Sequence, residues 1–292
     1  MHIKTAIPVL MLSGCLLGSL PAQKSQSIET AVKRRLITCR GSVEVLYSGQ
    51  KLKLEVKNRS RDTVVFHVDP GQIFTPTNAA YQPLIATRQK TIRLAPGEER
   101  PVYVNALCGD QPKMSASDGT TEFTMGGRAS SALAAMLQQI QELGWEKNIN
   151  MQNLVWAFTN DMSIASLEVE GLDALSRQKL MRLMTTKSGQ SEPWYQIKYR
   201  PADPSSPILF SGIADEIKGD LKYELAQTDD IRIQVIDAQG RIQKTLWFIP
   251  GQAPGRYTLP LKFAAEELPL GQYCVRVEGR NALTYAKFNF EI

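Results

Sequence analysis

From about residue 36 the chain consists of short segments in which apolar and polar residues alternate. In residues 51–57, Leu52, Leu54 and Val56 occupy every second position, which predicts a strand with one buried and one solvated face. Turn clusters that contain Pro and Gly separate this segment from others of the same kind. Strands are expected over residues 42–47, 51–57, 63–68, 91–94 and 101–107. Short strands at this spacing predict a β-sandwich over residues 36–110.

The middle of the chain changes to a helical period. Five apolar residues lie three or four positions apart, between a capping Ser130 or Ser131 and a terminating Gly144: Leu133, Met136, Leu137, Ile140 and Leu143. This pattern predicts one amphipathic helix. A second helix is expected after Asn150 and a third over residues 172–185. We therefore predict a mainly helical subdomain over residues 111–199, whose apolar faces pack on one another or on the first sandwich.

Residues 200–207 contain three prolines, which disfavour both helix and sheet and predict an extended linker. After it, strand-like segments recur over residues 221–225, 231–236, 241–249, 257–263, 273–278 and 284–290. Six or seven strands in so short a stretch predict an Ig-like sandwich over residues 208–292. The expected fold class is mainly β with a helical subdomain: an N-terminal β-sandwich plus helices, and a C-terminal Ig-like β-sandwich.

Several motifs of the last third follow one another in a family order. VIDAQGRI (235–242) resembles the V-Y-D-x-x-G-R-x-V hairpin of type IX secretion sorting domains and of Ig-like domains of the flagellar hook-cap family. In that hairpin Ile236 replaces a typical Tyr, and LPLGQYCVRV (268–277) is similar to the family's L-x-x-G-x-Y-x-V-R-V strand. The resemblance implies an Ig-like fold without catalysis. It leaves two roles open: a sorting signal that the outer-membrane secretion machinery recognises and removes, or a retained structural domain.

The first residues have the pattern of an export signal. Lys4 precedes an apolar run over residues 6–20, which predicts a signal peptide over residues 1–22 with cleavage after Ala22. The sequence Leu12-Ser13-Gly14-Cys15 resembles a bacterial lipobox and implies lipidation of Cys15 as the alternative. Either route predicts an exported protein, and the resemblance of the last third to type IX sorting domains implies a Gram-negative bacterium that secretes it or holds it on its surface.

Composition and charge narrow the chemistry. Of 292 residues, 43% are hydrophobic and 22% are charged, as in a globular protein. The net charge of +5 is small and dispersed and does not predict a nucleic-acid partner. There is no CxxC pair, and the only histidines are His2 and His67, so neither a zinc site nor another metal or cofactor site is expected. His67 lies in an alternating segment and is expected to be a half-buried strand residue.

An exported chain favours disulfide formation. Cys39 and Cys108 flank the predicted strands of the first sandwich, and a bridge between them would close a loop of about 70 residues and contribute roughly 4 kcal/mol. The sequence does not show whether the two residues come within bridging distance. Cys274 is expected to point into the second sandwich as a small apolar residue.

MQNLVW (151–156) resembles the T-Q-x-A-I-W helix of bacterial surface thioester domains. In that family the Gln side chain bonds an upstream Cys and captures host amines, which would give this chain a Cys108–Gln152 thioester. Met151 and Leu154 depart from the motif, and Leu107 stands where an aromatic residue is usual. The alternative is an ordinary buried helix with Gln152 exposed.

Three functions follow from these patterns. The first is a non-enzymatic binding or structural protein of the envelope, with an unidentified surface ligand. The second is a covalent adhesin that uses Cys108 and Gln152. The third is a secreted enzyme with dispersed site residues, which a polar pocket around Asp161 or His67 would favour. Phosphate-loop and dinucleotide motifs are missing from the sequence.

Overall fold

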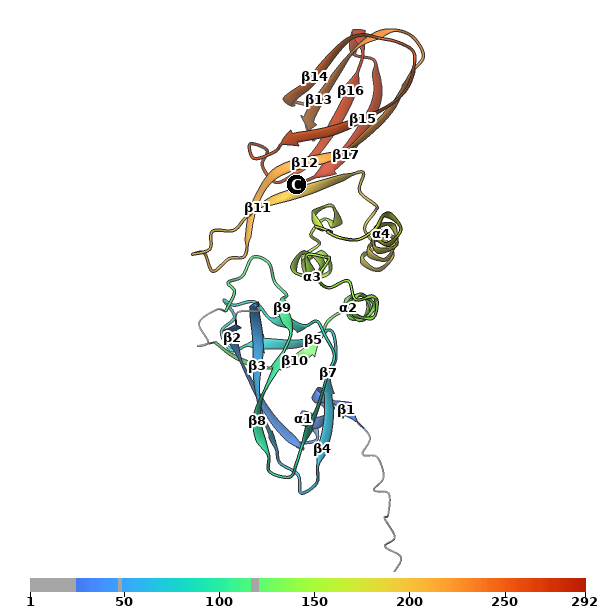
Figure 1. The fold of residues 1–292 in the computed structure, drawn as a ribbon. Coiled ribbons are helices and arrows are strands. Elements are labelled where there is room, and N and C mark those ends of the chain that lie inside the picture. Colours follow the sequence, from blue (N-terminus) through green and yellow to red (C-terminus); the bar gives the residue numbers. More distant parts are fainter. Residues whose placement is uncertain (1–24, 47–48, 117–120) are drawn as a thin grey trace, which may run out of the picture.

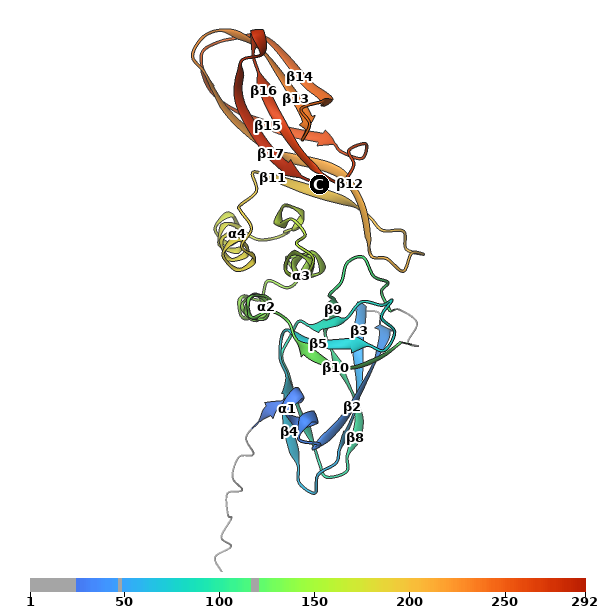
Figure 2. The ribbon, with the colours of Figure 1, turned by 180° about the vertical axis from the view of Figure 1, so that it is seen from behind.

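The computed structural model describes residues 25–46, 49–116 and 121–292. Two β-sandwiches lie at opposite ends of an elongated molecule, and a group of helices lies between them (Figures 1 and 2). The predicted signal peptide, including Cys15 and Ala22, falls outside the described residues. None of the helices in the described part is long and apolar enough to cross a membrane.

The N-terminal sandwich has a small and a large sheet. The small sheet has the order β1 (Gln26–Ser27), β4 (Val64–Val68), β7 (Lys90–Leu94). The large sheet has the order β8 (Glu99–Val104), β3 (Gly49–Asn58), β2 (Ile37–Leu46), β10 (Glu122–Arg128), β5 (Gln72–Pro76), β6 (Leu84–Ala86), β9 (Ala106–Cys108). The helix α1 (Ile28–Lys33) packs beside β1, and Phe66, Phe74 and Phe123 fill the core. The predicted alternation of Leu52, Leu54 and Val56 is confirmed, because all three are buried.

The boundary between this sandwich and the helices differs from the prediction. β10 lies inside the predicted helical range of residues 111–199, yet it pairs with both β2 and β5 in the large sheet. Its pairing with β5 shifts register between Met125 and Arg128, around Gly126 and Gly127. Gly residues weaken the alternating pattern of a strand. β10 can therefore be identified from its pairing with β2 and β5 in the sheet, but not from its own sequence.

The helical unit consists of α2 (Ser131–Leu143), α3 (Met151–Thr159), the short 3₁₀ helix η1 (Ile164–Ser166) and α4 (Ala174–Ser188). Ser130 and Asn150 cap α2 and α3 through their side chains, and Gly144 ends α2 with a φ of 69°, as the capping rules predict. The helices share one core with one another and with Ile85 of β6. In α4, Leu180 and Met184 are buried in this core, whereas Leu175 is 75% exposed.

The C-terminal sandwich packs a three-stranded sheet against a four-stranded sheet. The first has the order β11 (Tyr195–Pro201), β12 (Phe210–Leu225), β15 (Gly255–Ala264). The second has the order β14 (Ile242–Gln252), β13 (Asp229–Asp237), β16 (Gln272–Glu278), β17 (Thr284–Glu291), with the short η2 (Arg280–Ala282) before β17. Seven strands divided three and four give the Ig-like sandwich that the sequence predicted.

The predicted linker is wrong. Residues 200–207 include the end of β11 and the turn that joins β11 to β12, which pair antiparallel from Tyr195–Gly219 to Pro201–Phe210. The domain therefore begins near residue 194, rather than at residue 208. Pro201 is tolerated because β11 is an edge strand, where a missing N–H costs no ladder bond. The cluster of prolines thus forms a turn within the domain and does not separate two domains.

Candidate functional site

Cys108 and Gln152, which lie 44 positions apart, meet at the free edge of the large sheet. Gln152 Nε2 donates to the Cys108 carbonyl oxygen at 2.7 Å, and the Cys108 N–H donates to Gln152 Oε1 at 3.1 Å. β9 is the last strand of its sheet, so the side-chain amide supplies the donor and acceptor that a further strand would offer. The pair therefore fastens α3 to the N-terminal sandwich.

The Cys108 thiol points into a different environment. Its Sγ lies 3.7 Å from Ser115 Oγ, and the residue is 2% exposed. Burial raises the pKa of this thiol, and the Ser115 hydrogen bond offsets only part of the increase. A nucleophilic cysteine needs a lowered pKa. The Gln152 amide is bonded to backbone atoms, and the thiol is held in its neutral form. Gln152 is half-buried, rather than exposed as the ordinary-helix alternative stated.

The predicted Cys39–Cys108 disulfide does not form in the structure. Cys39, Cys108 and Cys274 are all free thiols. Cys39 lies on β2 and Cys108 on β9, and β10, β5 and β6 separate these strands in the sheet order. Burial raises the pKa of Cys39 to about 12. Cys274 on β16 is buried, but it does not point into the second sandwich as predicted, because its neighbours Tyr273 and Val275 belong to that core and Cys274 lies on the other face of the strand. The disulfide prediction was wrong because Cys39 and Cys108 both flank strands in the sequence, whereas their strands are not neighbours in the sheet.

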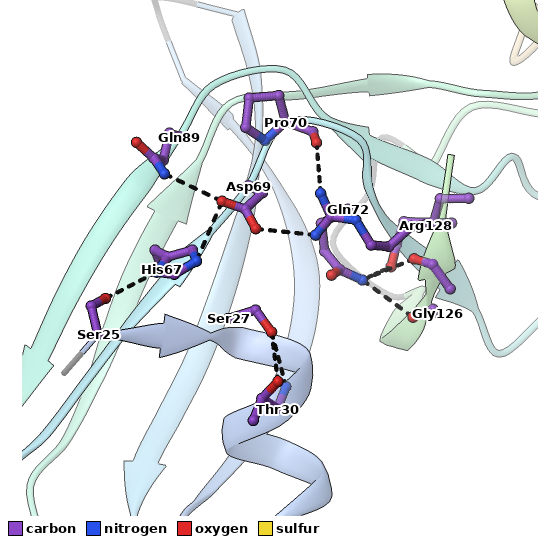
Figure 3. Close-up of polar contacts among 12 residues, drawn as sticks. Ser25, Ser27, Thr30, His67, Asp69, Pro70, Gln72, Gln89, Gly126 and Arg128 are labelled. Carbon is purple, nitrogen blue, oxygen red and sulfur yellow. Dashed lines mark hydrogen bonds and ion pairs between the residues drawn. The ribbon is translucent and has the colours of Figure 1, made fainter. Parts of the chain in front are cut away.

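His67 lies at the centre of a polar network on the N-terminal sandwich (Figure 3). Its Nδ1 is 2.9 Å from Ser25 Oγ and its Nε2 is 3.5 Å from Asp69 Oδ1. Asp69 also forms an ion pair with Arg128 at 3.1 Å and accepts a hydrogen bond from Gln89 at 3.3 Å. His67 is half-buried on β4, as expected from the sequence. The network joins β1 to the turn that follows β4.

A groove of about 780 Å³ begins beside this network and runs along α2. Asp69 and Arg128 are on its wall, together with Gln89, Gln138 and Glu142. The Asp69 carboxylate is already neutralised by Arg128, and Glu142 accepts a hydrogen bond from Gln138 at 2.9 Å. The Ser25–His67–Asp69 chain resembles a nucleophile relay in composition, but the Arg128 ion pair reduces the charge that Asp69 would offer to a protonated His67. The arrangement suits a structural role.

A second pocket, called here the junction pocket, lies where the helical unit meets the C-terminal sandwich. Its volume is about 350 Å³. Tyr195 and Tyr199 of β11 and Phe210 of β12 line it, and the Tyr199 and Phe210 rings meet edge to face at 4.8 Å between centroids. Met162, Leu270 and Ile292 add aliphatic surface. The pocket thus combines residues from the two units.

Two carboxylates also line the junction pocket. Asp161, between α3 and η1, is exposed and has a φ of 52°. Glu291, near the end of β17, contributes the other carboxylate. In the described part of the chain, neither side chain has a hydrogen bond or ion pair. Burial raises the pKa of Tyr199 to about 12, and Tyr195 and Glu291 add to the effect. The Tyr199 hydroxyl therefore stays neutral at ordinary pH.

The sequence analysis mentioned Asp161 only as a residue around which a polar pocket would favour an enzyme. It did not identify the aromatic residues of the junction pocket. Tyr195 and Tyr199 lie at the predicted helical subdomain's end, and Phe210 begins the predicted Ig-like domain. The available signal was the aromatic content of residues 194–199, which is unusual for a helical segment. Among the described residues, no group of His, Cys, Asp and Glu side chains is arranged to hold a metal ion.

Comparison with protein-family models and with curated proteins found no match for this chain.

Proposed function

We propose that the chain is an exported, non-enzymatic binding or structural protein of a Gram-negative cell envelope or its surroundings. Its Ig-like module remains attached and supports the rest of the molecule. The outer-membrane secretion machinery is the proposed partner in export, through the module's resemblance to sorting domains. A ligand at the cell surface is the proposed partner in function.

The main support for an Ig-like module that stays attached is the position of β11. β11 precedes the proline cluster in the chain but belongs to the C-terminal sandwich, where Tyr195 and Ile197 are buried in its core. Cleavage within residues 200–207 would separate β11 from β12 along the chain and leave an edge strand of the module on the wrong fragment. Continuity with the helical unit adds support, because Ala165 of η1 also lies in the core of the C-terminal sandwich.

The contacts around residue 190 strengthen this argument. Gln190 lies in the segment between α4 and β11, where cleavage would leave the sandwich complete. Its Oε1 accepts from the Ile164 N–H at 3.0 Å, and its Nε2 donates to the carbonyl oxygens of Met162 and Ala157 at 3.0 and 3.3 Å. A protease needs this segment extended and free. The hydrogen bonds of Gln190 oppose that opening.

The intact mass of the protein from its native host, measured in membrane and medium fractions, tests the proposal. A species that begins near Gln23, or at a lipidated Cys15, and that keeps Ile292 is the expected result. A mature species that ends between about residues 189 and 207 would show that the module is a removed sorting signal. A protein that stays in the cytoplasm with Met1 retained would contradict the proposed export.

The covalent adhesin is a second candidate because Cys108 and Gln152 do come together. A thioester would join Cys108 Sγ to Gln152 Cδ with release of ammonia, and an amine would then add to the acyl carbon and free the thiol. Incubation with methylamine, followed by peptide mass measurement, tests it, with Cys108→Ala as the control. The hydrogen bonds and the buried thiol lead us to expect no labelling. Methylamine on Gln152 in the unaltered protein alone would establish the covalent function.

A further inference from the structure

The charged side chains that line the junction pocket are all acidic. Asp161 and Glu291 are on its wall, and none of the described residues that line it is Lys, Arg or His. Elsewhere on the molecule, carboxylates are commonly paired, as Asp215 and Glu266 are with Arg200 at 2.8 and 2.7 Å. Among the described residues, no basic side chain lines the pocket or forms an ion pair with either carboxylate.

Its aromatic wall adds to this preference. The face of an aromatic ring carries negative electrostatic potential, so a cation near Tyr or Phe is attracted, most strongly where water is partly excluded. Tyr195, Tyr199 and Phe210 supply three rings in one small space. Tyr199 remains a neutral phenol, and no hydrogen bond occupies its hydroxyl in the described structure.

The backbone of the following residue, Met162, fixes the position of Asp161. The Met162 N–H donates to the Trp156 carbonyl oxygen at 3.3 Å, and the Met162 carbonyl oxygen accepts from Gln190 Nε2 at 3.0 Å. Asp161 itself adopts the left-handed conformation, which Asp and Asn tolerate better than other non-Gly residues. Its carboxylate is thus held at the pocket without a partner.

We propose that the junction pocket binds an organic ammonium group, such as an alkylated amine or a lysine side chain of a ligand. The aromatic rings contact the apolar part of the cation, and Asp161 and Glu291 neutralise its charge. A volume of about 350 Å³ accommodates a small ammonium head. The inference names a ligand class for the proposed binding role and therefore rests on it.

Titration of the purified full-length protein with tetramethylammonium chloride, followed by NMR or calorimetry, tests the inference. tert-Butanol has a similar shape without the charge and serves as the matched neutral probe, at constant ionic strength. We expect tetramethylammonium to bind at least about tenfold more tightly than tert-butanol. Equal binding of the two probes, or no saturable binding of the cation, would overturn the inference. Because the assay uses purified protein, its failure would leave export and module retention untouched.

Variants locate the binding. Asp161→Asn removes the charge and keeps a residue that tolerates the same backbone conformation, so we expect a loss in tetramethylammonium affinity of about fivefold, as for a partly exposed charge. Glu291→Gln is expected to act similarly, and Tyr199→Leu to reduce the preference over tert-butanol. Asp220→Asn, at an exposed and unpaired aspartate of the same sandwich, is the control. A loss in Asp220→Asn equal to that in Asp161→Asn would show that only net charge matters and would refute the site.

Discussion

The helical unit meets the two sandwiches in different ways. Toward the N-terminal sandwich, its apolar core continues into Ile85 of β6, and the Gln152 amide bonds both backbone groups of Cys108. Toward the C-terminal sandwich, Trp156 and Phe210 meet edge to face at 6.1 Å between centroids, and the junction pocket remains beside them. The first junction is packed and bonded, and in the groove along α2 Asp69 is paired with Arg128, whereas the junction pocket has two carboxylates without partners among the described residues.

This difference indicates at which junction a ligand can bind with the smaller loss of packing and hydrogen bonds. Filling the first junction would require breaking backbone hydrogen bonds and displacing buried apolar side chains, each at a cost of one to several kcal/mol. The second junction has space already and carboxylates without partners. Both junctions hold domains together, and of the two pockets described here the junction pocket is the one whose carboxylates have no partner among the described residues.

The largest expected effect concerns the extent of the C-terminal domain. A fragment of residues 191–292 should fold, and a fragment of residues 207–292 should not, because the second lacks β11 and leaves its partner β12 exposed. Dispersion of proton NMR signals and a cooperative denaturation curve provide the measurement. If the shorter fragment were equally stable, the C-terminal sandwich would not need β11. Residues 200–207 would then act as the linker that the sequence predicted.

The next effect compares the cores at the two junctions. Ile197 on β11 is 3% exposed and Leu154 on α3 is 0% exposed. Replacing either one by Ala is expected to reduce the free energy of unfolding by about 2–5 kcal/mol. We expect Ile197→Ala to lower the unfolding transition of the C-terminal sandwich and Leu154→Ala that of the N-terminal part. Calorimetry distinguishes the transitions. The exposed neighbour Gln196→Ala should change little, and a shift of both transitions by either core variant would mean that the molecule unfolds as one unit.

A smaller effect measures the bonded junction. Gln152→Ala leaves the Cys108 N–H and carbonyl oxygen without their present partners and should reduce stability by about 1–3 kcal/mol. Gln152→Glu keeps an acceptor but loses the donor and should be nearly as destabilising. The denaturant midpoint of the N-terminal transition is the measurement, and Gln138→Ala on exposed α2 surface is the control. A loss no greater than that of the control would remove the argument that this amide fastens α3.

The smallest effect is a pH dependence of the C-terminal sandwich alone. Asp229 accepts from the Tyr285 hydroxyl at 2.8 Å and from the Arg280 and Asp230 N–H groups, and these bonds hold its pKa below the ordinary value. A lowered folded pKa gives stability that is present above the unfolded pKa of about 3.9 and is lost as pH falls through the folded pKa.

We therefore expect the C-terminal transition temperature to fall as pH decreases below about 4, with a weaker dependence in Asp229→Asn. Thermal unfolding of both proteins between pH 5 and pH 3 provides the test. Equal pH dependence of the two would assign the acid sensitivity to other carboxylates.

The elements that the sequence predicted well are those with local causes. Ser130 and Gly144 bound α2 because capping depends on groups within one turn. Leu52, Leu54 and Val56 identify β3 because alternation is a property of a single strand. β10 and β11 were missed because their residues form strands only beside β2, β5 and β12, and pairing partners distant in the chain leave little local trace.

The candidate sites divide in the same way. The motif around Gln152 left two interpretations open, and only the thioester alternative brought Gln152 to Cys108; the two residues meet, through the Cys108 backbone. Which atoms meet was not predictable, because the direction of the thiol depends on Ser115 and the packing of β9. Asp161, Tyr199 and Glu291 come from three separate segments, so their pocket had no sequence motif.

The sequence by itself determined the mainly β composition, the helical middle, the Ig-like end and the small number of residues available for metal or nucleophilic chemistry. Periodicity, capping and residue counts are properties of the chain alone, so the sequence is sufficient for them. Only the tertiary structure decided that the proline-rich segment is a turn, that Cys39 and Cys108 stay apart, and that unpaired carboxylates and aromatic rings share one pocket. These outcomes depend on which strands become neighbours, and that choice is made by burial and pairing across the whole fold.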